Sequence, residues 1–506
     1  MHSTESPNQL ASEQVRQTKP APGPAPGPAP GPDPRPGSGS DAVSVVGRVL
    51  DAIPFNRAHR LILLMVLLGA FFDVMEENSL GAVGPALKSV WNISTPELAF
   101  LQTVTIGAMI IGKVVTGALG DHKGRRFALG FNLAIYCLGA LICALAPGYA
   151  VLAIGRFIVG VGLGGEIAAG MTMLSELVST KYRGAVVASL NVGAGGFGNV
   201  VSFGFAAVIL GPLGNFFGGP HNSWRWMFGL LVLPALLVLV YRRFLPETPR
   251  FLASRGRIDE ANGVLTRLAN GRLKDTGGPV TPYIQNPGAM AAPVEKVRLS
   301  EVFRGVLLRR TASLAVISWM TFGAQVTVLV LMPTILVEQG YTITKSLAFT
   351  MVMNLGSLFG AAAATWAALR LPRRAVITGG AVAACLAALA FGFLAKSPAL
   401  VLILGALFQF FVLLLNSTIF AWAPELYPTR VRAFGTAMVA VQGNVAGAFV
   451  PIGAGLLLDH AGVVAVFVLI AVMYCVMAVA SRFAPETHGR SLEDINSETT
   501  SQGVSQ

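Results

Sequence analysis

The stretch GALGDHKGRR, Gly117 to Arg126, concentrates charge and glycine between two long apolar runs. The run before it, residues 98–119, carries Lys113 as its one charged side chain, and the run after it, residues 127–145, carries none. Each run is close to the roughly 20 residues with which a helix crosses a bilayer. Short loops rich in Lys and Arg stay on the cytosolic side during insertion, so this turn orients every other segment.

The composition indicates a protein that crosses the membrane many times. Of the 506 residues, 53% are hydrophobic and 12% are charged, about half of the roughly 25% charge of a soluble domain. The net charge of +12 would suggest nucleic acid in a soluble chain, but most Lys and Arg fall in loops that we assign to the cytosol. We therefore expect no nucleic-acid partner.

Neither cysteines nor histidines suggest a cofactor. The cysteines lie inside apolar runs without CxxC spacing or a nearby histidine, which is typical of small core residues: Cys137, Cys143, Cys385 and Cys475. No glycine loop that would cradle the phosphates of ATP is present. We expect no enzyme, no metal and no cofactor, so transport energy must come from an ion gradient or from the solute's own gradient.

Twelve apolar segments have the length of a membrane span. The first six are residues 61–84, 98–119, 127–145, 149–174, 185–210 and 227–241. The last six are residues 311–337, 347–369, 375–394, 400–422, 434–458 and 463–480. We predict an all-α membrane protein with twelve transmembrane helices in two six-helix bundles, and an even number of spans puts both termini in the cytosol.

The same pattern divides the chain into five regions. Residues 1–56 contain the tract APGPAPGPAPGPDPRPG, which we expect to stay disordered, and lack the apolar core of a signal peptide. A helical patch is expected at residues 258–268. The other regions are an N-terminal bundle (57–243), a cytosolic central loop (244–308), a C-terminal bundle (309–483) and a cytosolic tail (484–506).

The two halves repeat each other in sequence. SELVSTKYRG (residues 175–184) and PELYPTRVRA (residues 424–433) both follow the fourth span of a half, and both place Glu and Arg seven residues apart. PETPRFL (residues 246–252) has its echo in PETHGRSL (residues 485–492). A parallel repeat of six spans is the architecture in which two bundles rock about a central site.

These motifs, with RFIVGVGLGGE (residues 156–166), resemble the major facilitator superfamily, in the branch of sugar porters and metabolite:proton symporters. The resemblance implies that conserved charges form cytosolic networks that latch the outward-facing state. Transferred residue by residue, these gating positions are Gly117, Asp121, Gly124, Arg125, Arg126, Glu176, Arg183, Glu247, Arg250, Glu425, Arg430, Arg432 and Glu486. The pairs expected from it are Glu176 with Arg183 and Glu425 with Arg432.

Two departures from the family pattern affect the prediction. The second-half equivalent of the opening loop is RLPRR (residues 370–374), which has no aspartate, so a lopsided latch is expected. The seventh span lacks the QQLSG sequence with which sugar porters hold hexose hydroxyls, so a hexose substrate is disfavoured.

Charges at membrane depth should form the functional core, because each costs roughly 2.5 to 3.5 kcal/mol even on the insertion scale. Asp73 lies ~18 Å into the first span and Arg156 ~10 Å below the outer end of the fourth, which is nearly the same depth. Depth therefore predicts an Asp73–Arg156 pair. The resemblance implies proton coupling for such a pair, in which protonation of Asp73 frees Arg156 to hold a carboxylate. A static ion pair that orients two helices is the alternative.

Other charged residues of the first bundle have separate expected roles. Glu76 and Glu77 share a helical face with Asp73; Glu76 is assigned to proton coupling and Glu77 to a watery outer vestibule. Glu166 lies ~15 Å deeper than Arg156, where it would gate the inner side or relay protons, or line a solvated cavity. Lys113 is expected to snorkel to the cytosolic surface.

Amides within the spans are candidate substrate ligands, although such amides equally often join helices. They are Asn191, Gln325, Asn354, Gln409, Asn416, Gln442 and Asn444. Together these features predict a secondary transporter of the cell (plasma or inner) membrane. It would move a small organic solute, an organic acid or related metabolite, by alternating access with proton symport. A facilitator or exporter of sugars or organic cations and a transporter-like sensor are the alternatives. The expected partners are the solute, protons and the lipid bilayer, with a monomeric protein.

Overall fold

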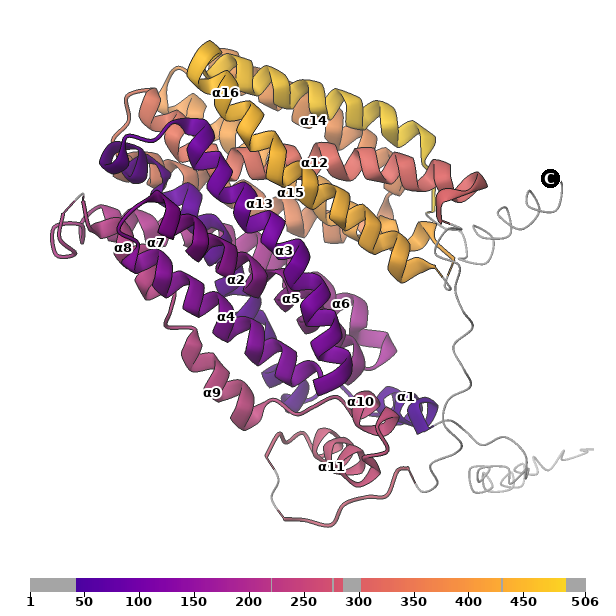
Figure 1. The fold of residues 1–506 in the computed structure, drawn as a ribbon. Helices are drawn as coiled ribbons and strands as arrows, with labels where there is room; N and C mark the ends of the chain where they lie inside the picture. The colour runs from indigo at the N-terminus through magenta and orange to yellow at the C-terminus, as the bar shows by residue number, and fades with distance from the viewer. Residues whose placement is uncertain (1–41, 220, 275–276, 285–301, 429–430, 488–506) are drawn as a thin grey trace, which may run out of the picture. The chain divides into compact units, whose positions relative to one another are not determined.

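The computed structural model describes residues 42–219, 221–274, 277–284, 302–428 and 431–487. Within these ranges nearly every residue is helical and no strand occurs. In Figure 1 the first half of the chain, in indigo to magenta, and the second half, in salmon to yellow, each gather into a group of long helices. The expected all-α membrane fold is confirmed.

The first half contains four uninterrupted spanning helices: α2 (Arg57–Trp91), α3 (Thr95–Lys123), α4 (Arg125–Leu145) and α5 (Tyr149–Leu177). Local sequence sets where they begin. Asn56 caps α2 and Ser94 caps α3, and in the second case the Glu97 carboxylate accepts a hydrogen bond from the Ser94 backbone N–H at 2.7 Å. These reciprocal bonds satisfy amide groups that a helix start would otherwise leave unpaired.

The fifth and sixth spans are less regular than the sequence predicted. The fifth is built from α6 (Thr180–Leu190), the π-helix η1 (Asn191–Phe197) and α7 (Gly198–Leu210). The sixth divides into α8 (Ser223–Leu230) and α9 (Ala235–Phe244), with a turn between them that ends at Pro234. Proline has no N–H to donate within a helix, which explains the interruption.

The second half continues with α12 (Gly305–Glu338), α13 (Ile343–Arg370), α14 (Arg373–Leu394) and α15 (Pro398–Trp422). The last helix, α16 (Arg432–Ala480), is two spans joined at Gly462, whose φ of 75° breaks the helical path. Ten described helices are long and apolar enough to cross a membrane; counting α16 as two spans and adding α8–α9 gives the predicted twelve.

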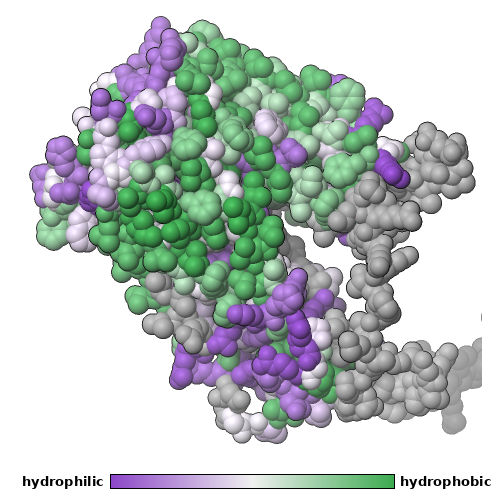
Figure 2. Space-filling view, viewed as in Figure 1, coloured by the Kyte–Doolittle hydropathy of each residue, from purple (hydrophilic) through white to green (hydrophobic). Residues whose placement is uncertain are grey.

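Each half of the chain has its own hydrophobic core. One is built mainly from α2–α9 around large buried side chains such as Trp224 and Phe228. The other is built mainly from α12–α16 around Trp422, Phe408 and Phe467. In Figure 2 a broad hydrophobic surface covers the helices, and hydrophilic side chains gather below it where α10 (Pro249–Ser254) and α11 (Ile258–Ala269) lie in Figure 1. This banding suits a protein surrounded by lipid.

Short helices collect at one end of the first bundle. We call the end where α3 and α4 meet at Gly124 the basic end, and the end where residues 92–94 join α2 to α3 the opposite end. Helix α11 matches the patch expected at 258–268. Helix α1 (Ala42–Ala52) lies within the tail that the sequence assigned to disorder, and Asp51 accepts a hydrogen bond from the Thr180 N–H at 2.7 Å.

The bundles meet closely along the half nearer the opposite end. A Cβ atom on Gly81 of α2 would lie 2.5 Å from the Leu329 carbonyl of α12, so only glycine allows this approach. In the same half, Thr103 of α3 donates to the Ala448 carbonyl of α16. A Cβ on Gly204 of α7 would lie 2.8 Å from Met351 of α13.

Candidate functional site

A fully buried ion pair joins three helices of the first bundle. Arg156 of α5 contacts the Glu76 carboxylate of α2, with 3.0 Å between Nη1 and Oε1, and neither side chain is exposed. Arg156 also donates to Ser79 at 3.2 Å and, through Nε, to Thr105 of α3 at 3.0 Å. Hydrogen bonds to the remaining groups are what make such a buried pair tolerable.

Asp73 is therefore not the partner of Arg156, contrary to the prediction from depth. Depth fixes a residue's level in the membrane but not its direction around the helix axis. Glu76 is three residues further along α2, ~4.5 Å in rise and on the same side of the helix. The two carboxylates lie at nearly the same depth, and the position of Arg156 on α5 brings it to Glu76.

Asp73 instead shares a second buried region with Glu166. A Cβ atom on Gly69, one turn before Asp73, would lie 2.7 Å from Glu166 Oε1 and 2.4 Å from the Tyr241 hydroxyl. The carboxylates of Asp73 and Glu166 repel each other electrostatically. Both side chains are buried, and within the described part of the chain none of their four oxygens has a hydrogen-bond partner. Tyr241 donates to the Met65 carbonyl at 2.9 Å and closes the region on the side of α9.

Lys113 is half-buried on α3, and its expected snorkelling to the cytosolic surface stays a prediction. It lies seven residues after Ile106, so the two share one face of α3. Ile106 belongs to the core of the second bundle, and a Cβ on Gly447 of α16 would lie 3.4 Å from it. Lys113 interacts electrostatically with Glu77 of α2. The sequence identified Lys113 but not its neighbour Glu77, because the face of α3 that carries Lys113 could not be known without the packing of the helices.

The amides predicted as substrate ligands have different surroundings. Asn354 is satisfied locally, since it donates to Thr350 at 2.8 Å and accepts from Ser357 at 3.2 Å. Asn416 of α15 donates to Gln325 of α12. Two buried amide atoms, Gln409 Oε1 and Asn444 Nδ2, have no hydrogen-bond partner among the described residues. Asn191 opens the π-helix η1, and Gln442 is half-buried on α16.

A charge network at the basic end binds the loops of the first bundle. Arg125 contacts Glu176 at 3.4 Å, and the Thr248 hydroxyl donates to the same carboxylate at 2.6 Å. Glu247 accepts from the backbone N–H groups of Arg125 at 2.9 Å and Arg126 at 3.2 Å. Burial raises the pKa of Glu247, although these N–H groups, that of Thr248 and the charge of Arg125 oppose the shift.

The second bundle repeats most of this network, so the difference between the halves that RLPRR suggested is limited to one ion pair. Arg373 contacts Glu425 at 3.4 Å, and Thr487 donates to Glu425 at 2.5 Å. Glu486 accepts from the backbone N–H groups of Arg373 and Arg374, each at 2.9 Å. The difference between the halves is Asp121, which pairs with Arg125 at 2.9 Å and has no acidic counterpart in RLPRR.

The remaining gating positions have individual surroundings. Gly124 has a φ of 98°, and a Cβ there would lie 2.2 Å from the Glu247 carboxylate, whereas a Cβ on Gly117 would meet nothing within 4 Å. Arg250 of α10 lies against Gly47 of α1. Arg432 donates to the Tyr427 carbonyl at 3.3 Å. The side chain of Arg183 and all of Arg430 lie outside the described residues.

A polar cluster at the opposite end joins the two bundles. Lys88 of α2 contacts Glu338 of α12 at 3.0 Å and donates to Thr95 of α3 at 2.6 Å. The Thr95 N–H donates to Asp459 of α16 at 3.1 Å. No signal in the sequence distinguishes these residues, because charges at helix ends are ordinary and no motif pairs them across the halves.

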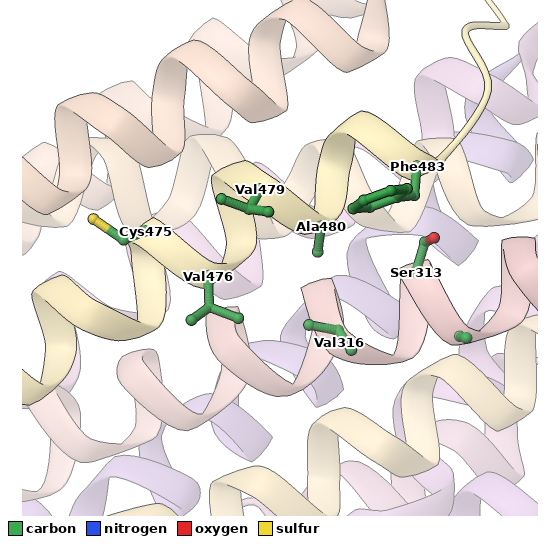
Figure 3. A pocket seen from close by; sticks show the side chains of 8 residues that line it. Ser313, Val316, Cys475, Val476, Val479, Ala480 and Phe483 are labelled. Carbon is green, nitrogen blue, oxygen red and sulfur yellow. The ribbon is translucent and has the colours of Figure 1, made fainter.

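A groove between α12 and α16 has a different character (Figure 3). It is lined mainly by apolar side chains, with Val316, Val476 and Phe483 among them, and Ser313 supplies a hydroxyl group. None of the described residues that line it is charged.

Twelve helical spans in two bundles, with an ion pair buried between helices of the first, are the architecture of the major facilitator superfamily of membrane transporters. The family model described as sugar (and other) transporter matches residues 73–498. The chain belongs to this family.

Known proteins similar to this chain are transporters of several solutes. The niacin transporter NiaP of Acinetobacter baylyi is 29% identical over 458 residues, which cover 90% of this chain and 100% of that protein. The 4-hydroxybenzoate transporter PcaK of the same species is 25% identical and covers 79% of this chain and 85% of its own. The inward-open xylose transporter XylE of E. coli has a TM-score of 0.70 at 19% identity, over 87% of this chain and 99% of its own.

Proposed function

We propose that this protein is a proton-coupled symporter that moves a small organic acid across the cell membrane by alternating access. The observation that carries the proposal is the buried pair of carboxylates, Asp73 and Glu166, which have no hydrogen-bond partner among the described residues. Ionisable groups at membrane depth are costly and mark ion pathways. A symporter needs such groups because a proton must be taken up and released inside the protein.

The chemistry of the carboxylate pair favours proton carriage. Two carboxylates that repel each other in an apolar region are stabilised when one of them holds a proton. Arg156 neutralises Glu76 directly and is held away from Asp73 by its bonds to three side chains. We assign Asp73 and Glu166 to proton binding, and Glu76 with Arg156 to a charge pair beside it whose state changes with the conformation of the bundles.

The organic-acid substrate is supported by two similarities. Niacin and 4-hydroxybenzoate are both small aromatic molecules with one carboxylate, and the proteins named for their transport are similar to this chain over most of its length. The seventh span also lacks the hexose-binding sequence of sugar porters. Arg156, fully enclosed by Glu76, Ser79 and Thr105, is not available to a solute in this conformation.

Alternating access would use both ends of the bundles. We assign the basic end to the cytosol because short Lys- and Arg-rich loops remain there, which places both termini inside. The networks of Glu176 and Glu425 would hold the loops of each bundle while the bundles rock. The cluster of Lys88, Glu338 and Asp459 would then close the outer side, and one chain carries every element of this cycle.

The test is transport in proteoliposomes made with purified protein. Radiolabelled nicotinate and 4-hydroxybenzoate are supplied outside, with and without an inward proton gradient, and empty liposomes correct for passive entry of the acids. Gradient-driven accumulation is expected for the wild type. Asp73→Asn and Glu166→Gln should lose it while they keep exchange of labelled for unlabelled solute, because exchange needs no net proton movement.

Glu260→Gln is the matched control, since Glu260 is an exposed carboxylate of α11 that pairs with Arg257. It should behave as the wild type. Uptake that only equilibrates the solute, and that is unchanged by the proton gradient and by both buried variants, would refute proton coupling and favour a facilitator. Uptake of sugars or organic cations without uptake of either acid would refute the substrate class.

A further inference from the structure

Lys113 and Glu77 occupy one level of the molecule where the bundles face each other. Helices α2 and α12 run in parallel, with Gly81 beside Leu329 and Lys88 beside Glu338. Four residues before Gly81, the same register places Glu77 at the level of Gln325. Because residues four apart share a helix face, Glu77 lies on the side of α2 that approaches α12.

The register of α3 with α16 brings Lys113 to a similar position. These helices are antiparallel, since Thr95 bonds to Asp459 and Thr103 to Ala448. Lys113 lies ten residues beyond Thr103, which corresponds to α16 residues near Met438, about one turn from Gln442. The registers thus place Glu77 level with Gln325, and Lys113 about one helical turn from Gln442.

Neither charged group is neutralised by a close partner. Among the described residues, Lys113 and Glu77 make no ion pair within 4 Å and no hydrogen bond, although they interact electrostatically. Both are half-buried, in contrast to the sealed Arg156 and Glu76. An ammonium group at membrane depth without a partner persists when it faces a water-filled cavity or a ligand.

We propose that Lys113 binds the carboxylate of the transported solute, and that Glu77 competes with the solute for Lys113 in the empty carrier. This inference rests on the proposed organic-acid substrate. The ammonium group is a compact charge with three donors, suited to a single carboxylate. Glu77 would repel a second carboxylate, so the site selects monocarboxylates, and the nearby amides of Gln325 and Gln442 can hydrogen-bond the rest of the molecule.

Equilibrium binding to detergent-solubilised protein tests the assignment without transport. Nicotinate and 4-hydroxybenzoate are titrated by calorimetry, beside their neutral amides, nicotinamide and 4-hydroxybenzamide. Lys113→Met should weaken binding of both acids about tenfold or more, as for loss of a hydrogen bond to a charged group. Binding of the amides should change less than twofold, and Lys113→Arg should restore part of the affinity for the acids.

Glu77→Gln guards against simple loss of structure in the lysine variant. It should strengthen binding of both acids several-fold, because it removes the competitor for Lys113, and it should let dicarboxylates such as phthalate bind. Lys345→Met, which removes an exposed lysine of α13, is the control. Every variant is checked by its melting temperature.

The outcomes separate this inference from the proposed function. Unchanged acid binding in a folded Lys113→Met variant would overturn the role of Lys113, even if the wild type shows proton-driven uptake. Weaker acid binding in Glu77→Gln would overturn the role of Glu77 as a competitor. Acid binding that depends on Lys113, together with uptake that ignores the proton gradient, would support the site and refute only proton coupling.

Discussion

The buried pair of Arg156 and Glu76 allows a direct test of which acid the arginine contacts. Arg156→Met removes one ion pair and two hydrogen bonds to side chains, at 3.0 Å to Glu76, 3.2 Å to Ser79 and 3.0 Å to Thr105. Glu76 then remains fully buried without a cation. Loss of one member of a buried pair costs about 3–5 kcal/mol. We expect that loss in the free energy of unfolding, measured by SDS titration of the protein in mild detergent.

A second substitution identifies the partner. Adding Glu76→Gln to Arg156→Met removes the buried charge that has lost its partner. It should recover about 2 kcal/mol of unfolding free energy, because much of the cost of breaking a buried pair is the charge left uncompensated. Adding Asp73→Asn instead should recover less than half as much, since Asp73 does not contact Arg156. Equal recovery by Asp73→Asn, or greater recovery than by Glu76→Gln, would refute the pairing described here.

Three further predictions concern the two ends of the bundles. Gly124→Ala should destabilise the protein by about 1–3 kcal/mol, because φ is 98° and the new Cβ would strike Glu247, whereas Gly117→Ala, with open space around it, should stay within ~0.5 kcal/mol; thermal melting compares them. Since burial raises the pKa of Glu247, the folded state holds that proton more tightly, so the wild type should gain stability relative to Glu247→Gln as pH falls from about 7 to 5; the difference between their melting curves checks the sign. Lys88→Glu should slow or speed solute exchange by about 1.5- to 5-fold, as a half-exposed pair is worth ~0.2–1 kcal/mol, and exchange should return towards the wild-type rate in the charge swap with Glu338→Lys.

Much of the fold is readable in the sequence because lipid imposes a simple rule. Backbone groups in a bilayer must bond within their own helix, so long apolar runs identify the spans directly. The same rule hides local irregularity: the run at 227–241 is apolar throughout, yet the helix is interrupted before Ala235. The predicted boundary between the spans 434–458 and 463–480 agrees with the break at Gly462, since glycine tolerates its positive φ.

The candidate site was predictable in its members but not in its pairings. Asp73, Glu76, Arg156 and Glu166 stand out because charges are rare at membrane depth, and each is buried. Their partners depend on how α2 is rotated towards α5, which hydropathy does not encode. Lys113 shows the same limit, since a lysine that snorkels and one that faces another bundle have identical sequence neighbours.

The repeated networks at the basic end could be foreseen only in part. RLPRR was judged by its missing aspartate, but the contacts that recur are made by Arg373 through its side chain and its backbone N–H. Backbone donors carry no sequence signature. A motif can therefore lose its most recognisable residue and keep most of its hydrogen bonds.

The cluster of Lys88, Glu338 and Asp459 makes the conformational balance sensitive to dissolved ions. Its side chains are 24%, 36% and 26% exposed, so mobile ions reach them. The Debye length is about 8 Å at physiological ionic strength and about 3 Å at 1 M salt. Concentrated salt on that side would weaken the attraction that holds the bundles together there and favour their separation. In the proposed transport cycle, the salinity of the surroundings would act as an effector that needs no binding site of its own.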